Sequence, residues 1–133
     1  MTPRCGTRPS ATGDSLMLVL RGEIREVDFE PVRGSEASKH RPAVVVSNDG
    51  ANATASRLNR GVITVVPVTS NVSRVYPFQV LLPASQCGLS RDSKAQAEQI
   101  RSVAVERVGR RVGQLPAFLL LALEDALRLH LGL

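Results

Sequence analysis

The sequence predicts a mainly β domain: a small, strongly bent antiparallel barrel closed by one C-terminal helix. Short runs rich in Val, Ile and Thr alternate with polar loops that contain Gly and Pro, which is typical of a sheet of short strands. A single apolar segment with helical character follows Pro116. The length of 133 residues fits one domain with its own core.

Six segments are expected to form strands. They are Gly22–Phe29, Pro42–Ser47, Val62–Thr69, Phe78–Leu82, Ser93–Val105 and Arg111–Gln114. The first alternates charged and apolar residues with a slip or bulge, and Pro67 places an edge or bend in the third. The fifth contains Ala and Gln residues that would also suit a helix. Residues 30–40 and 48–60 are polar and are expected to be loops.

The two ends of the chain differ in composition. Residues 1–16 are rich in Thr, Pro, Ser and Gly without apolar periodicity, and we expect a flexible extension there. Residues 17–133 are expected to form the single domain, and Met17 is a candidate initiator. Pro116 is expected to open the first turn of a helix that runs to about Leu131. Apolar residues lie nearly all round this helix, which predicts burial against the sheet and a second subunit.

Composition excludes several classes of protein. The net charge of +5 permits a polyanionic partner such as nucleic acid, although 15 of the 17 basic residues are arginine and could also reflect codon usage. Only four aromatic residues are present, which argues against RNA binding by several stacked rings. The longest apolar run, Leu115–Leu123, is far too short to span a membrane, so we expect a cytoplasmic protein.

No metal centre or cofactor site is expected. Cys5 and Cys87 form no CxxC pair, and only His40 and His130 could join them as ligands. No spacing of glycines matches a nucleotide-binding loop. Free thiols in a reducing compartment are favoured over a disulfide between the two cysteines.

Polar residues gather where the loops meet the apolar strands. Arg41 directly precedes Pro42, which forces an extended backbone at the start of a buried strand and could fix a guanidinium for phosphate binding. Thr69 ends the next strand, and Gln99 and Arg101 lie two apart on a predicted strand face. For each of these, a solvated surface or simple turn chemistry is the alternative interpretation.

Five blocks in order resemble the MazF/PemK family of toxin endoribonucleases. They are RGEI…VDFEPVRGSEASKHRPAVVVSND, VVPVTS, YPFQVLLP, GLSRDSKAQAEQIRSV and VGRRVGQL. The resemblance covers residues 18–115 and, less specifically, the terminal helix. It implies an SH3-like barrel of the CcdB/PemK kind, assembled as a homodimer and neutralised by a MazE-like antitoxin with an acidic tail.

The same resemblance implies an activity. The chain would cut single-stranded RNA without a metal ion at short sequences, in mRNA and also in rRNA or tRNA. The ribose 2′-OH would attack the phosphorus, leaving a 2′,3′-cyclic phosphate and a 5′-OH. Two rival functions remain on this fold: a CcdB-like gyrase poison, disfavoured because the chain has no Trp, and a non-catalytic RNA-binding barrel.

The resemblance assigns catalytic roles to three residues. Arg41 would stabilise the negative charge of the transition state, and Thr69 would donate a hydrogen bond to the phosphate. Glu36 is the least defined: it is a candidate general base or a partner that holds Arg41. Gln96 and Glu98 stand where some relatives have an arginine and an aspartate, which puts that version of acid–base catalysis in doubt for this chain.

RNA binding is assigned to residues on both sides of the groove. His40, next to Arg41, is a further candidate base because imidazole titrates near neutral pH. Phe29 would stack on a base or belong to the core. The complete predicted set is Phe29, Arg33, Gly34, Ser35, Lys39, His40, Ser70, Asn71 and Gln99.

Overall fold

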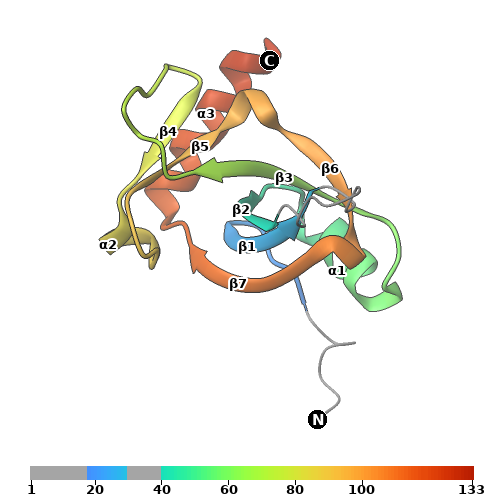
Figure 1. The fold of residues 1–133 in the computed structure, drawn as a ribbon. Coiled ribbons are helices and arrows are strands. Elements are labelled where there is room, and N and C mark those ends of the chain that lie inside the picture. The colour runs from blue at the N-terminus through green and yellow to red at the C-terminus, as the bar shows by residue number, and fades with distance from the viewer. Residues whose placement is uncertain (1–17, 30–39) are drawn as a thin grey trace, which may run out of the picture.

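The computed structural model describes residues 18–29 and 40–133, and these form a bent sheet with three helices (Figure 1). The strands are β1 Glu23–Asp28, β2 His40–Val45, β3 Val62–Thr69, β4 Gln79–Leu82, β5 Ser93–Gln96, β6 Arg101–Ala104 and β7 Val108–Gln114. The helices are α1 Asp49–Leu58, α2 Ala84–Cys87 and α3 Ala117–Leu131. The predicted flexible extension, residues 1–16, lies outside the described residues.

All strand pairs are antiparallel, and their order is β4-β5-β3-β2-β1-β7, with β6 beside the first half of β3. The register shifts twice between β1 and β7, at the position where a slip or bulge was expected. Such bulges increase the local twist and help to bend the sheet. The predicted mainly β fold with a C-terminal helix is therefore confirmed.

Two apolar cores lie on the two faces of the sheet. The helix-side core packs one face against α3 and includes Val44 and Leu123. The barrel core lies within the curve of the sheet and includes Ala43 and Val45. Because side chains alternate along a strand, the uninterrupted apolar run of β2 supplies both cores at once. This explains why the run shows no polar alternation.

Residues 48–60 were expected to be a loop, and that prediction is wrong because they contain α1. The side chain of Asn48 caps the helix by accepting a hydrogen bond from the backbone N–H of Ala51 at 2.8 Å. Asn59 ends it in the left-handed conformation, with φ of 51°. The side chain of Asn52 is fully buried and donates to the carbonyl of Ser47 at 2.8 Å. The polar composition reflected caps and this buried contact rather than a loop.

The expected strand Ser93–Val105 is interrupted. A 3₁₀ turn at Ala97–Gln99 separates β5 from β6, so Gln99 and Arg101 do not share the face of one strand as predicted. Pro67 lies in β3 between the residues that pair with β6 and those that pair with β5. On this side of β3 the ladder is interrupted at Pro67, so the missing N–H of the proline costs no hydrogen bond there, and β3 is not an edge strand.

The structure differs from two smaller predictions as well. The loop after β4 contains the short helix α2. Pro116 is the N-cap of α3, one residue before the first turn where it was expected. Proline has no backbone N–H, and at the N-cap this removes no hydrogen bond from within the helix.

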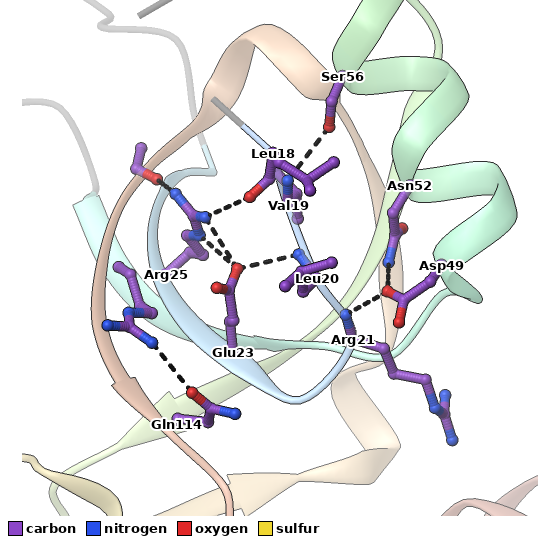
Figure 2. A network of polar contacts seen from close by, with 12 residues as sticks. Leu18, Val19, Leu20, Arg21, Glu23, Arg25, Asp49, Asn52, Ser56 and Gln114 are labelled. Atoms are coloured by element: carbon purple, nitrogen blue, oxygen red, sulfur yellow. Dashed lines mark hydrogen bonds and ion pairs between the residues drawn. The ribbon is translucent and has the colours of Figure 1, made fainter. Parts of the chain in front are cut away.

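The segment that precedes β1 is held against the barrel by a buried ion pair (Figure 2). Arg25 Nη2 lies 2.8 Å from Glu23 Oε1, and both side chains are almost completely buried. The Arg25 guanidinium also donates to the carbonyls of Leu18 and Gly109, at 2.8 and 3.1 Å. Glu23 accepts a further bond from the backbone N–H of Leu20 at 2.9 Å. These contacts keep Val19 fully buried in the barrel core.

Gly113, in β7, is expected to tolerate no larger residue. A Cβ added there would lie 2.5 Å from the backbone oxygen of Cys87 and 3.3 Å from Ile24 Cδ1. We expect Gly113→Ala to lower the free energy of unfolding by about 1–3 kcal/mol, measured by urea denaturation. Gly50→Ala, which meets only the flexible side chain of Asn48, is the matched control. Equal stability of Gly113→Ala and the wild type would contradict the close packing of β7 on α2.

Candidate functional site

A groove of about 750 Å³ opens at the ends of β2 and β3. The loop after α2 and strand β7 form its other walls. Its lining residues are Glu26, Arg41, Pro42, Val68, Thr69, Ser70, Gly88, Leu89, Ser90, Arg91, Ser93, Arg110, Arg111 and Val112. Four of these are arginines and one is a carboxylate, so the described walls carry a positive balance. A groove with this balance suits a polyanion.

The pairing of β2 with β3 brings Arg41 and Thr69 together. The ladder ends at the pair Ala43–Pro67, and Arg41 in β2 and Thr69 in β3 each lie two residues beyond it, at the same end of the sheet. Both residues line the groove, and Arg41 is exposed rather than turned into the interior. The two side chains can therefore act on one bound phosphate.

The start of β2 explains the position of Arg41. Pro42 follows it and restricts it to extended backbone. Ala43 and Val45 are fully buried and anchor the strand in the barrel core. A rigid strand thus carries the guanidinium at its exposed end, as the sequence predicted.

The hydroxyl of Thr69 already has one hydrogen bond. Its Oγ1 accepts from the backbone N–H of Asn71 at 3.2 Å. Asn71 Oδ1 in turn accepts from the backbone N–H and the hydroxyl of Ser73, at 3.3 and 2.9 Å. Because Oγ1 is used as an acceptor, its proton is available for a phosphate oxygen. Asn71 therefore orients Thr69 and shapes the turn that follows β3.

His40 lies in a different groove from Arg41. A second groove of about 670 Å³ is lined by His40 together with residues of β1 and β7 and the turn between β6 and β7. Successive residues of a strand point to opposite faces, so neighbours in sequence separate here. The Glu26–Arg110 ion pair, at 3.4 Å, borders both grooves. The structure thus does not bring His40 and Arg41 into one groove.

The remaining described residues of the predicted RNA-binding set do not all lie in the first groove. Ser70 lines the first groove, whereas Gln99 is exposed in the 3₁₀ turn. Phe29 packs partly buried against the barrel core, with the Arg101 guanidinium 5.1 Å from the centre of its ring. This packing agrees with the core alternative for Phe29, and the guanidinium of Arg101 lies over the ring; stacking on a base stays a prediction. Five predicted residues, Arg33, Gly34, Ser35, Glu36 and Lys39, lie outside the described residues.

Four charged lining residues were missed by the sequence analysis. Arg91, Arg110 and Arg111 supply most of the positive charge of the groove, and Glu26 supplies its carboxylate. The pair Arg110–Arg111 in the final strand was the available signal, but sequence alone does not say that β7 lies beside β1.

Other predicted features can be located in the described residues. No three His, Cys, Asp or Glu side chains are grouped there as metal ligands would be. Cys87 is a free, buried thiol, and burial raises its pKa. Cys5 lies outside the described ranges. None of the helices in residues 18–29 and 40–133 has both the length and the apolar character needed to cross a bilayer.

Comparison with known proteins agrees with this geometry. Residues 20–131 match the family described as PemK-like, MazF-like toxin of type II toxin-antitoxin system. The chain is 65% identical to endoribonuclease MazF9 of Mycobacterium tuberculosis over 116 residues, which cover 87% of this chain and 98% of that protein. It is 31% identical to endoribonuclease EndoA of Bacillus subtilis over 118 residues, covering 88% and 97% of the two chains.

Comparison of the fold with solved structures also finds MazF proteins. A crystal structure of MazE–MazF from Deinococcus radiodurans superposes with a TM-score of 0.72 at 29% identity, covering 88% of this chain and 98% of that one. The family match spans the groove, the helix-side core and α3. The chain therefore belongs to the PemK-like, MazF-like toxin family of type II toxin–antitoxin systems.

Proposed function

We propose that the chain is a toxin endoribonuclease that cuts single-stranded RNA at short sequences without a metal ion. The observation that carries this proposal is that Arg41 and Thr69 line one groove together with three further arginines. The names of the relatives from M. tuberculosis and B. subtilis describe them as endoribonucleases. Since translation and its RNAs are in the cytoplasm, we place the activity there.

The proposed reaction is an internal transfer at phosphorus. The ribose 2′-OH attacks, the bond from phosphorus to the 5′-oxygen breaks, and a 2′,3′-cyclic phosphate and a 5′-OH result. Negative charge grows on the phosphoryl oxygens, where a guanidinium fork and a hydroxyl donor stabilise it. Arg41 and Thr69 supply these groups. Because arginine holds its proton far above neutral pH, its role is electrostatic.

The proton of the 2′-OH needs an acceptor. We propose Glu36 for this step, as the family resemblance implies. Glu26 is a carboxylate on the described wall of the groove, but it is paired with Arg110 at 3.4 Å. His40 lies in the second groove and is the weaker choice.

We expect the chain to be inhibited by an antitoxin and to form a homodimer, as the family resemblance implies. The positive groove would be covered by the acidic tail of a MazE-like antitoxin, and the D. radiodurans neighbour is by name a MazE–MazF complex. A homodimer is proposed because α3 exposes large apolar side chains. Phe118, Leu121 and Leu129 are 58%, 60% and 61% exposed. A monomer seldom leaves such a stripe in water.

The test is cleavage of a long RNA in the presence of EDTA, with cut sites mapped by primer extension. We expect discrete cuts that leave 5′-OH ends, and no loss of activity with the chelator. RNA binding with no product over hours would instead support the non-catalytic barrel. Gyrase trapped on cleaved DNA would support the CcdB-like alternative, and cleavage that EDTA abolishes would contradict the mechanism.

A further inference from the structure

Lys94 is a buried cation beside Thr69 that the mechanism does not use. It lies in β5 and is only 8% exposed. The β3–β5 ladder pairs it directly with Thr69. Opposed residues of an antiparallel pair share a face of the sheet. Lys94 and Thr69 therefore share one face of the sheet, and Arg41 lines the same groove as Thr69 from β2, on the other side of β3.

The loop that follows Thr69 fixes the ammonium of Lys94. Its Nζ donates to the backbone oxygen of Arg74 at 2.5 Å and lies 5.9 Å from the centre of the Tyr76 ring. The Tyr76 ring stacks on Phe78 with centroids 5.3 Å apart and nearly parallel planes. The side chain of Lys94 is thus held in one place before any ligand binds.

Arg74 adds a second cation to the same ring. Its Cζ lies 5.7 Å from the centre of the Tyr76 ring, and its Nη1 donates to the Tyr76 hydroxyl at 3.2 Å. Arg74 and Tyr76 are both exposed. One aromatic ring therefore gathers two cations at the end of β3.

The two cations have no negative partner among the residues that the structure describes. The ion pairs there involve neither Lys94 nor Arg74. A buried charge without a counter-ion is costly, and Lys94 retains three donors of which one reaches the Arg74 carbonyl. An anion bound beside Thr69 would compensate that cost. In an RNA substrate the anions on either side of the scissile phosphate are the neighbouring phosphates.

We propose that Lys94 and Arg74, held by Tyr76, form a subsite for the RNA phosphate next to the one that is cleaved. This inference rests on the proposed ribonuclease function and extends its site by one nucleotide. The subsite contributes affinity and register along the strand, and it leaves the chemistry to Arg41 and Thr69. Phosphate contacts of this kind position a nucleic acid without reading its bases.

The test measures binding of a short RNA that contains a mapped cut site and a 2′-deoxy sugar at the cleaved position, so that it cannot react. Log Kd is followed against log salt concentration for the wild type, Lys94→Met and Arg74→Met. For single strands each lost phosphate contact lowers the slope by about 0.7. We expect that loss for Lys94→Met, with Kd raised about tenfold. Arg74→Met should show a smaller loss, and Arg60→Met, at the other end of β3, none.

A neutral methylphosphonate linkage then locates the contact. Placed on the correct side of the cleavage site, it should weaken binding to the wild type, and it should weaken binding to Lys94→Met to a smaller extent because only Arg74 remains there. An effect of equal size in both proteins would overturn the proposal. If Lys94→Met fails to fold, the exposed Arg74→Met gives the same comparison.

Three other outcomes also test the proposal. A wild-type protein that cuts no RNA refutes the proposed function itself. A wild type that cuts, with variants that bind RNA at the wild-type slope, refutes only the subsite. Variants with normal RNA binding but weaker inhibition by poly-glutamate would assign the two cations to an acidic protein partner and overturn the RNA assignment.

Discussion

Replacing Arg41 with alanine is expected to lower kcat for RNA cleavage by a factor on the order of 10² to 10³. The guanidinium lines the same groove as Thr69 and is proposed to stabilise charge that develops only in the transition state. The loss should therefore fall on kcat more than on KM. Arg41→Lys keeps the charge without the planar fork and should recover only part of the activity. Initial rates on a fluorogenic RNA oligonucleotide measure both variants.

The control for this prediction is an arginine of similar exposure away from the groove. Arg60 precedes β3, at the end of the strand remote from Thr69, and Arg60→Ala should cut RNA at the wild-type rate. Because Arg41 is exposed, its alanine variant should also unfold at the wild-type temperature. Full activity in a folded Arg41→Ala protein would remove the central element of the mechanism.

Replacing Arg25 with methionine is expected to lower the free energy of unfolding by about 3–5 kcal/mol, because one partner of a buried ion pair is removed. The Glu23 carboxylate would stay buried without its cation, and the carbonyls of Leu18 and Gly109 would lose their donors (Figure 2). The segment 18–21 should loosen with them. Urea denaturation followed by circular dichroism measures the change.

Two further variants separate the missing partner from the missing packing. The double variant Glu23→Gln, Arg25→Met removes the uncompensated charge and should recover part of the stability. Arg128→Met breaks the exposed pair with Asp125 in α3, at 2.9 Å, and should leave the unfolding curve unchanged. An Arg25→Met protein as stable as Arg128→Met would show that the buried network does not hold the N-terminal segment.

Much of the barrel was predictable because its signals are local. β3 coincides with the predicted strand Val62–Thr69, since a β-branched run between polar loops has few other conformations. Helix α1 was missed because its polar side chains serve as caps and buried hydrogen-bond partners. The break between β5 and β6 was missed for a different reason. It depends on which part of β3 each segment pairs with.

The sequence by itself determined the fold class, the strand that carries Arg41 and the strand end that carries Thr69. These depend on hydrophobic pattern and on backbone restriction by Pro42, which act within a few residues. Only the tertiary structure decided that Arg41 and Thr69 line one groove, that Lys94 pairs with Thr69, that β7 brings Arg110 and Arg111 to the groove, and that His40 lines a second groove. The reason is that strand order and register are set by long-range packing, and a shift of one residue would move each of these side chains to the opposite face.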